Sequence, residues 1–258
     1  MTTFGLCLVR DAVDIIGPVV EHMLTQVDHV IVADNLSTDG TREVLDALPI
    51  TVIDDPDPAY HQSTKTTALA MRAADLGATW VVPFDADELW YSPFGRIGDV
   101  LTGLGDYAVA SAALYDHVPT ALDPPDPNPL TRMGWRRRNP GSLPKVAVRP
   151  LPGLTIHMGN HGCDYGPLRG ETVAGQLVVR HFPYRSPDQF VDKALTGAAA
   201  LAMTDLPADA GAHWRQYAAL EAANPGALAG VFREHFWSAD PTADRSLIFD
   251  PAPGGVRA

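Results

Sequence analysis

Residues 80–90 read WVVPFDADELW, an apolar run, interrupted by one proline, that leads into three carboxylates. A short run of this kind, rich in β-favouring residues, is typical of a buried strand. Carboxylates as close as Asp85, Asp87 and Glu88 repel one another unless a counter-ion lies among them. The segment therefore predicts a strand that ends at a bound cation.

Strands and helices alternate on the N-terminal side of this segment. The predicted strands are 4–9, 29–33, 50–53 and 79–84, and the predicted helices between them are 15–27, 41–48 and 63–76. Strands that alternate with helices form βαβ units with a parallel sheet and right-handed crossovers. We therefore expect an α/β fold whose mostly parallel, Rossmann-like sheet is flanked by helices.

Polar residues follow each of these predicted strands. Arg10 and Asp11 follow the first, Asp34 the second, the pair Asp54-Asp55 the third, and the carboxylate cluster at 85–88 the fourth. The carboxyl ends of parallel strands line one crevice, where ligands of open α/β sheets bind. The strand ends together predict a polar ligand site at one edge of the sheet.

The pattern changes after residue 90. A helix at 96–104 and a strand at 107–115 precede a proline-rich loop, and three β-like segments follow at 145–149, 155–158 and 177–182. Helices at 187–203 and 208–223 and an irregular tail past Asp240 complete the prediction. We expect a single domain over 1–258, with a first half at 1–90 and a mixed second half at 91–258.

Composition excludes several classes of protein. Of 258 residues, 46% are hydrophobic and 19% are charged, and the net charge of −12 disfavours nucleic acid as a partner. The one basic cluster, Arg136–Arg138 with Arg132 nearby, is best explained as a solvated loop. Cys7 and Cys163 are too few and too far apart for a disulfide framework or a zinc site. With no signal peptide and no integral membrane segment in the pattern, we predict a cytoplasmic protein.

The Asp-x-Asp triplet at 85–87 suits a hard divalent cation. Two neighbouring carboxylates, completed by water and phosphate oxygens, are the ligands that Mg²⁺ and Mn²⁺ prefer. The alternative is that Asp85 or Asp87 caps a helix that begins here. His181 follows another apolar strand, LVVRH at 177–181, and Arg180, Arg185 and Lys193 supply cations suited to phosphate around it. We predict His181 as a further metal ligand.

Several segments resemble family 2-like glycosyltransferases with the GT-A fold. They are LVRDAVDIIGPVVEHML, VDHVIVADNLSTDGT, the 63–76 helix, WVVPFDADELW and VVRHFPYRSPDQFVDKAL. The resemblance implies a nucleotide-sugar donor, a divalent metal (Mn²⁺ or Mg²⁺) and an acceptor hydroxyl on a small molecule or a glycan. It also makes 1–90 the nucleotide-binding half and 91–258 the acceptor half with the C-terminal helices.

The resemblance also implies roles for individual residues. Asp85 and Asp87 would contact the ribose and the metal-bound diphosphate, and Asp85, Asp87 and His181 would ligate the metal. The remaining predicted nucleotide contacts are Arg10, Asp11, Asp34, Asp54, Asp55, Lys65, Lys145, Arg185 and Lys193. For Lys145, a surface position is an equal alternative. Among donors, a UDP-sugar is preferred, with GDP- and TDP-sugars left open.

Two departures from the family pattern affect the chemistry. The first loop reads Arg-Asp-Ala, where many relatives carry Asn-Glu-Glu, and the Glu-Asp pair that supplies the base in many inverting members is absent from the sequence. A base near the acceptor would instead be a carboxylate. The candidates are Asp164, Glu171 and Glu88, with His157 and His161 as further possibilities. We hypothesise inversion because the likeness is to inverting relatives.

The sequence leaves alternatives from other classes of function. A non-catalytic nucleotide-sugar-binding or accessory protein of the same fold is the main alternative. A Rossmann-like methyltransferase is disfavoured because no Gly-x-Gly loop follows the first strand. A nucleotidyltransferase is disfavoured because residues 5–15 have no glycine-rich phosphate loop.

Overall fold

The parallel part of the sheet comes first along the chain. The computed structural model describes residues 1–166 and 172–252. Contacts divide the chain into two compact units: a first unit of residues 1–56, 62–115 and 139–181, and a second unit of residues 57–61, 116–138 and everything from 182 on.

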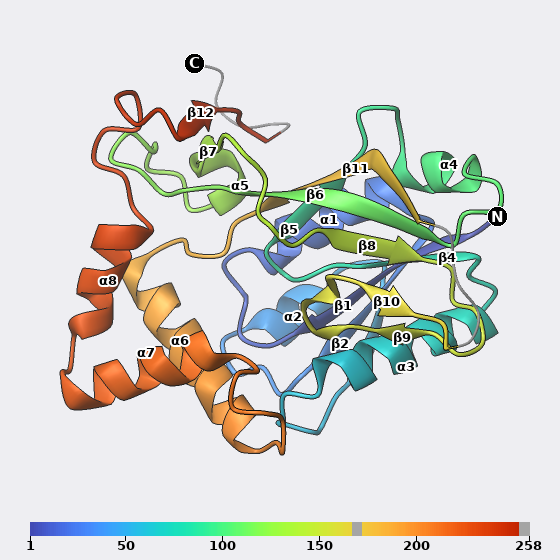
Figure 1. Ribbon diagram of the computed structural model, residues 1–258, viewed down its shortest axis with the longest axis horizontal. Coiled ribbons are helices and arrows are strands. Elements are labelled where there is room, and N and C mark those ends of the chain that lie inside the picture. The colour runs from blue at the N-terminus through green and yellow to red at the C-terminus, as the bar shows by residue number, and fades with distance from the viewer. Residues whose placement is uncertain (167–171, 253–258) are drawn as a thin grey trace. The chain divides into compact units, whose positions relative to one another are not determined.

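The first half of the first unit alternates strands with helices, as predicted. In chain order the elements are β1 (Thr3–Val9), α1 (Ile16–Gln26), β2 (His29–Asp34), α2 (Thr41–Asp46), β3 (Thr51–Asp54), α3 (Gln62–Asp75) and β4 (Trp80–Pro83). The four strands lie side by side in the order β3-β2-β1-β4, and all three pairings are parallel. Figure 1 labels β1, β2 and β4 of this part of the sheet. The α/β class with a parallel first half is confirmed.

This strand order places a switch point between β1 and β4. The chain moves outward from β1 to β2 to β3 and then returns past β1 to β4. Right-handed crossovers put helices on opposite faces when this direction reverses, and ligands of open α/β sheets bind at the carboxyl ends of the strands at such a point. The segment after β4 is the carboxylate cluster, which therefore lies where open α/β sheets bind ligands.

Antiparallel strands extend the sheet. They are β5 (Glu88–Tyr91), β6 (Val109–Asp116), β8 (Lys145–Val148) and β11 (Thr172–His181), and the full order is β3-β2-β1-β4-β8-β6-β11-β5. The unit also contains α4 (Ile97–Thr102), the two-stranded β9 (Thr155–Ile156) and β10 (Cys163–Asp164), and the short 3₁₀ helix η1 (Met158–Asn160). The predicted mixed second half is confirmed.

The core of the first unit holds the bulky aromatics around the carboxylate cluster. Trp80, Phe84 and Trp90 are almost completely buried, so Trp80 serves the core. Gly5 in β1 permits this packing, because a Cβ there would lie 3.1 Å from the Phe84 ring. A rigid, close-packed layer therefore supports the turn that carries Asp85 and Asp87.

The second unit is mainly helical. Its elements are α5 (Pro129–Arg132), β7 (Trp135–Arg137), α6 (Pro187–Ala202), α7 (Ala212–Ala223), α8 (Ala227–His235) and β12 (Leu247–Phe249). Phe190, Ala194, Leu228 and Phe232 form its buried cluster. The elements of this unit that lie outside the predicted ones are α5, β7, α8 and β12.

Strand β12 corrects the prediction of an irregular tail. It pairs antiparallel with β7, so that Leu247 lies opposite Arg137. The arginines of the predicted basic loop hold this pairing: Arg136 contacts Asp250 at 2.6 Å, and Arg138 donates to the carbonyl of Leu247. The partners are more than a hundred residues apart, so local sequence pattern does not reveal the strand.

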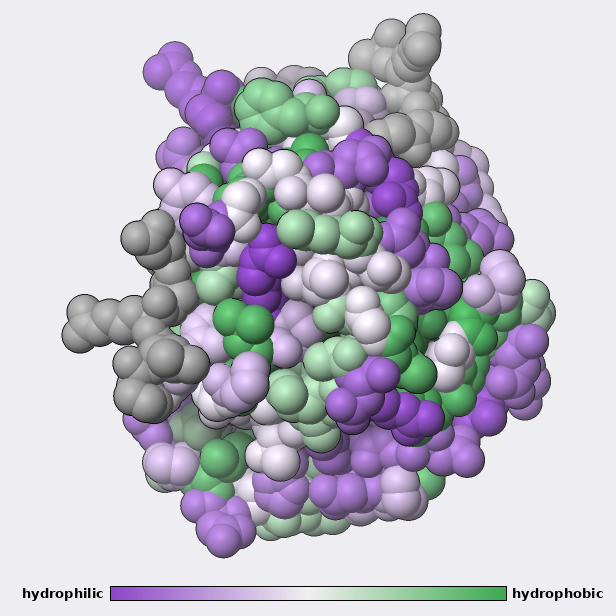
Figure 2. All heavy atoms as spheres, turned by 90° about the vertical axis from the view of Figure 1, so that its right-hand side faces the viewer, coloured by the Kyte–Doolittle hydropathy of each residue, from purple (hydrophilic) through white to green (hydrophobic). Residues whose placement is uncertain are grey.

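No helix among the described residues is long and apolar enough to cross a membrane. On the face shown in Figure 2, hydrophilic side chains are interspersed with smaller groups of hydrophobic ones.

Candidate active site

The residues DADE at 85–88 form a tight turn between β4 and β5. The Glu88 amide donates to the Asp85 carbonyl at 3.0 Å, and the Asp85 amide donates to Glu88 Oε2 at 3.1 Å. The chain then continues as strand β5, so the alternative of a helix capped by Asp85 or Asp87 is wrong. The turn presents Asp85 and Asp87 separately and folds Glu88 back into the protein.

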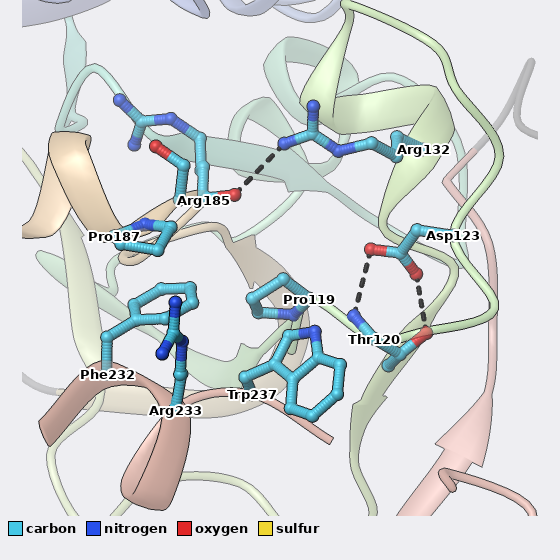
Figure 3. Close-up of a pocket in the computed structure, with 10 residues that line it drawn as sticks. Pro119, Thr120, Asp123, Arg132, Arg185, Pro187, Phe232, Arg233 and Trp237 are labelled. Carbon is cyan, nitrogen blue, oxygen red and sulfur yellow. Dashed lines mark hydrogen bonds between the residues drawn. The ribbon is translucent and has the colours of Figure 1, made fainter. Parts of the chain in front are cut away.

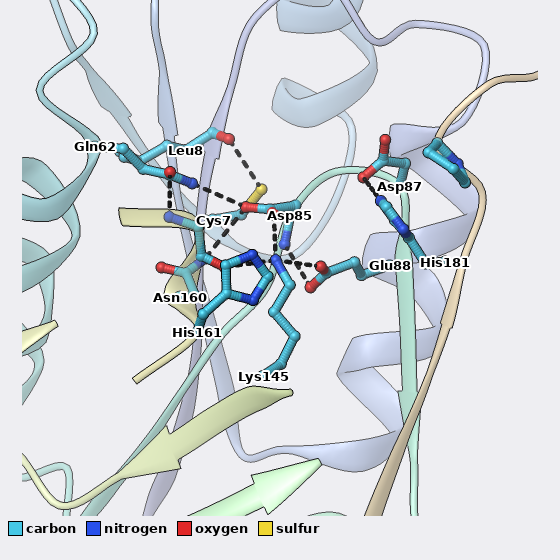
Figure 4. Close-up of polar contacts among 12 residues, drawn as sticks. Cys7, Leu8, Gln62, Asp85, Asp87, Glu88, Lys145, Asn160, His161 and His181 are labelled. Carbon is cyan, nitrogen blue, oxygen red and sulfur yellow. Dashed lines mark hydrogen bonds and ion pairs between the residues drawn. The ribbon is translucent and has the colours of Figure 1, made fainter. Parts of the chain in front are cut away.

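A buried lysine is the counter-ion of this turn. Lys145 Nζ lies 2.6 Å from Asp85 Oδ2 and 2.6 Å from Glu88 Oε1 (Figure 4). It also donates to the Gly159 carbonyl at 2.7 Å, which accounts for a third ammonium hydrogen. Glu88 is fully buried, and Lys145 is 3% exposed. Of the two alternatives for Lys145, the surface position is wrong.

The environment of this cluster shifts the pKa values of Lys145 and Glu88. Burial by itself would lower the pKa of the Lys145 ammonium, but Asp85 and Glu88 outweigh it and hold that pKa well above its ordinary value. Burial raises the pKa of the Glu88 carboxyl, and the Lys145 charge opposes that rise. Lys145 is therefore a permanently charged part of the site.

Two amide side chains that sequence reasoning missed complete the shell of Asp85. Gln62 Nε2 and Asn160 Nδ2 each donate to Asp85 Oδ1 at 3.1 Å. Gln62 also accepts from the Gly159 amide at 2.8 Å, which ties η1 to α3. With Lys145 on its other oxygen, Asp85 is held by hydrogen bonds on both sides. Asparagine and glutamine carry no distinctive sequence signal, so their roles depend on the fold.

Strand pairing brings His181 to Asp87. β11 pairs antiparallel with β5, and His181 lies opposite Glu88 in this register. Its Nε2 lies 3.6 Å from Asp87 Oδ1, and both side chains are largely buried. Figure 4 shows the two side chains pointing toward one another, away from Lys145.

The geometry fits two protein ligands for a divalent cation. At 3.6 Å, the carboxylate and the imidazole are too far apart for a good hydrogen bond. Two adjacent ligands of an octahedral Mg²⁺, each about 2.1 Å from the ion, lie about 3 Å apart, so a small adjustment would let both reach one ion. Among the described residues, no three His, Cys, Asp or Glu side chains are grouped for a metal. Asp85, the third predicted ligand, instead holds Lys145, Gln62 and Asn160.

A second polar group lies at the ends of β2 and β3. Asp55 accepts from Asn35 at 2.9 Å and pairs with Lys65 at 2.8 Å. Arg42 forms ion pairs with Asp34 and Asp54. These contacts bring four of the predicted nucleotide residues, Asp34, Asp54, Asp55 and Lys65, into one region of the strand ends.

The first strand-end loop is held in an unusual backbone conformation. Asp11 has a φ of 49°, and its Oδ1 accepts from the Thr38 amide at 2.7 Å. Arg10 lies 3.5 Å from the Asp11 carboxylate. The loop after β1 is therefore tied to the loop after β2, where the resemblance puts the nucleoside.

The candidate bases occupy different environments. Asp164 is 75% exposed and lies 2.9 Å from His157 Nε2, which makes an exposed carboxylate–imidazole pair. His161 Nδ1 donates to the Pro144 carbonyl at 2.8 Å, and burial lowers the pKa of the His161 ring. Because Glu88 is fully buried, it has no path to an acceptor. We assign it to the group formed by Lys145, Asp85 and Glu88, which we call the Lys145 cluster. Glu171 lies outside the described residues.

Arg185 and Lys193 belong to the second unit. The Arg185 guanidinium donates to the Phe182 carbonyl at 3.0 Å, and Lys193 donates to the Pro183 carbonyl at 3.3 Å. Their predicted contact with a donor phosphate stays a prediction.

The sequence of the first half carries a recognisable family pattern. Residues 9–125 match the sequence model of glycosyl transferase family 2. This confirms the resemblance inferred from the strand-end motifs. A comparison with curated protein sequences finds no match.

Several solved structures are similar at low identity. TarS 1–349 of S. aureus in complex with UDP is 13% identical, with 91% of this chain and 75% of that chain covered and a TM-score of 0.41. Mannosyl-3-phosphoglycerate synthase from Rubrobacter xylanophilus is 23% identical over 44% of this chain and 40% of that chain, with a TM-score of 0.33.

Glucosyl-3-phosphoglycerate synthase from Mycobacterium tuberculosis, in complex with Mn²⁺, UDP and phosphoglyceric acid, is 18% identical. The alignment covers 44% of this chain and 43% of that chain, with a TM-score of 0.33. At these TM-scores, none of the three assigns a role to a residue of this chain.

Proposed function

We propose a metal-dependent transferase that inverts the anomeric carbon of its donor, on the premise that residues 9–125 match the model of glycosyl transferase family 2. The donor is a nucleotide sugar, with UDP preferred as the nucleotide, and the acceptor is a hydroxyl group. The observation that carries the proposal is the approach of Asp87 to His181 at the carboxyl edge of the sheet, next to a fixed lysine.

Asp87 and His181 would hold the cation, and the donor diphosphate and water would complete its shell. Mg²⁺ and Mn²⁺ commonly bind nucleotides through one or two protein side chains in this way. When bound, the ion would neutralise the charge that grows on the leaving diphosphate. The Asp34, Asp54, Asp55 and Lys65 group would contact the nucleoside.

The Lys145 cluster fixes the position of the Asp85 carboxylate, two residues before Asp87. Asp85 is the residue that connects the Lys145 ammonium with Gln62 and Asn160, so its carboxylate is positioned before a donor arrives. Preorganised charges of this kind stabilise a transition state without reorganising during the reaction. We propose that Asp85 contacts the donor through this fixed orientation and does not ligate the metal.

Inversion requires a base for the acceptor proton. The acceptor oxygen forms a bond to the anomeric carbon while the bond from that carbon to the diphosphate breaks, and the acceptor proton moves to the base. We propose Asp164 for this role, with His157 orienting it, because the loop that carries both also supplies Asn160 to the shell of Asp85. Glu171 is the second candidate.

The test is metal-dependent release of nucleotide diphosphate. A panel of UDP-, GDP- and TDP-sugars with Mn²⁺ should give donor hydrolysis or transfer with at least one donor, most readily a UDP-sugar. Asp87→Asn should lower kcat/KM by at least about 100-fold, more than the loss of an outer-shell partner of a metal ligand. The control is Asp75→Asn, which removes an equal charge from an exposed position at the end of α3.

Three results would contradict the proposal in different places. Full activity of Asp87→Asn, or of the wild type in excess EDTA, would exclude the metal site. Retention of the donor's anomeric configuration, measured by NMR, would exclude inversion. Binding of the nucleotide sugar with no release of nucleotide diphosphate from any donor would favour the non-catalytic binding protein.

A further inference from the structure

The second unit contains a pocket of its own. Its volume is about 360 Å³, within the usual range for a small-molecule site. Figure 3 shows the pocket between α8, the start of α6 and the segment around residues 119–132. Its lining residues are Pro119, Thr120, Asp123, Arg132, Arg185, Ser186, Pro187, Phe232, Arg233 and Trp237.

Guanidinium groups reach this pocket from different sides. Arg233 is exposed on α8 and rises beside the Phe232 ring, whereas Arg132 lies at the far wall (Figure 3). Arg132 donates hydrogen bonds to the backbone carbonyls of Asp126 and Arg185, at 3.3 and 3.1 Å. Carbonyl oxygens orient a guanidinium without neutralising its charge. Arg132 is therefore held in place as a cation.

The acidic residue of the pocket, Asp123, accepts hydrogen bonds within the pocket wall. Among the described residues that line it, Asp123 is the sole carboxylate. Its Oδ2 accepts from the Thr120 amide at 3.0 Å, and its Oδ1 accepts from the Thr120 hydroxyl at 2.7 Å. Both carboxylate oxygens therefore stabilise a turn in the pocket wall. The arginine charges of the lining outnumber the single negative charge of Asp123.

The beginning of α6 adds a further positive end. Ser186 caps this 16-residue helix by accepting from the Gln189 amide at 3.2 Å, and Ser186 and Pro187 both line the pocket. The N-terminus of a helix carries a partial positive charge that favours anions. Asp188 in the first turn offsets part of this charge, so the Arg132 and Arg233 side chains are the main cations of the pocket.

An aromatic surface completes the pocket. Trp237 is 37% exposed and lies near Pro119, and the Phe232 ring forms another part of the wall. An indole face that is partly open to solvent can accept the apolar face of a ring. The pocket therefore combines cations for an oxyanion with a platform for the group that carries it.

We propose that this pocket binds a sugar phosphate, with the phosphate monoester between Arg132 and Arg233 and the sugar ring against Trp237. A phosphate monoester carries about −1.5 to −2 charges at pH 7. Two guanidinium groups therefore neutralise a phosphate monoester, whereas a carboxylate would neutralise one of them. The chain as a whole carries −12, so long-range attraction cannot recruit an anion and local cations must do so. All residues that line this pocket belong to the second unit, so the binding site does not rest on the proposed function.

The test is equilibrium binding by calorimetry, which needs no turnover. The probes are glucose 6-phosphate, glucuronate, glucose and inorganic phosphate. We expect glucose 6-phosphate to bind best, inorganic phosphate to bind more weakly, and glucose not to bind. Arg233→Gln should raise the Kd for glucose 6-phosphate about tenfold or more, because a charge-assisted contact is lost.

Matched variants separate the parts of the site. Arg245→Gln removes the same charge from an exposed position of the second unit that does not line the pocket, and it should leave the Kd unchanged. Trp237→Leu should weaken binding of glucose 6-phosphate but leave binding of inorganic phosphate as it is. Circular dichroism should show that each variant is folded.

The contrary results are equally specific. Equal affinity of Arg233→Gln and the wild type, or no binding of either phosphate probe, would overturn the site. Glucuronate binding as tight as glucose 6-phosphate would overturn the choice of phosphate. Binding of UDP with Mn²⁺ is measured on the same variants, so a failure of the pocket is distinguished from a failure of the proposed donor site.

Discussion

Lys145 carries a single positive charge between two carboxylates, one of them fully buried. Breaking such a buried pair by removing one partner costs about 3–5 kcal/mol, because the remaining charge has lost its solvent and its counter-ion. We expect Lys145→Met to lower the free energy of unfolding by about this amount, measured by urea denaturation. The double variant Lys145→Met with Glu88→Leu should recover part of the loss, since it removes the buried charge as well. An unchanged midpoint for Lys145→Met would show that the cluster does not stabilise the fold.

Cys163 provides a test of the electrostatics near Asp164. Burial, followed by the Asp164 charge, raises the pKa of the Cys163 thiol to about 11. The thiolate is the reactive form, so at pH 8 alkylation by iodoacetamide should be about two orders of magnitude slower than for an ordinary cysteine, and it should accelerate as the pH rises toward 11. Asp164→Asn should lower this pKa and speed the reaction, as peptide mapping by mass spectrometry would measure. Equal rates at Cys163 in both proteins would contradict the assignment.

At the scale of elements, two helices of the second unit begin at glycines with positive φ. Gly211 precedes α7 with a φ of 63°, and Gly226 precedes α8 with a φ of 89°. A Cβ at Gly226 meets open space, whereas a Cβ at Gly211 would collide with the Leu201 side chain. We expect Gly226→Ala to lower the free energy of unfolding by about 1–2 kcal/mol, the cost of a left-handed conformation, and Gly211→Ala to lower it further.

Denaturation of the two alanine variants under the same conditions measures this difference. The pair is matched because both glycines occupy the residue before a helix of the second unit. Equal losses would show that Leu201 moves aside without cost, and the loss would then reflect backbone strain alone.

At the scale of the whole molecule, the two units have separate buried clusters. Strands β1, β2 and β4 lie within the parallel sheet and are buried along most of their length, whereas α7 contains no buried residue. Local opening is easiest where few apolar contacts are lost. We expect hydrogen exchange, followed by mass spectrometry, to be slowest in these strands and, among the longer helices, fastest in α7. Exchange in α7 as slow as in β1 would contradict this expectation.

Sequence periodicity was sufficient to predict many of the strands and helices of the first unit. The predicted strands and helices up to residue 84 correspond to β1 through β4, because each element there shows its own hydrophobic period and turn residues. The polar residues after these strands could be placed at one edge because parallel strands share their carboxyl ends. Short elements with distant partners, such as β5, β7 and β12, escaped prediction.

By itself, the sequence determined that carboxylates gather at the end of β4 and that a cation must lie among them, because like charges on adjacent residues require one. Tertiary structure alone decided which positively charged group lies next to which carboxylate. Lys145 reaches Asp85 and Glu88 from β8, 57 or more residues away, while the register of β11 on β5 brings His181 to Asp87. Strand order and register join residues whose spacing along the chain has no period, so this division of the cluster into a fixed ion pair and a proposed metal site follows from the folded sheet.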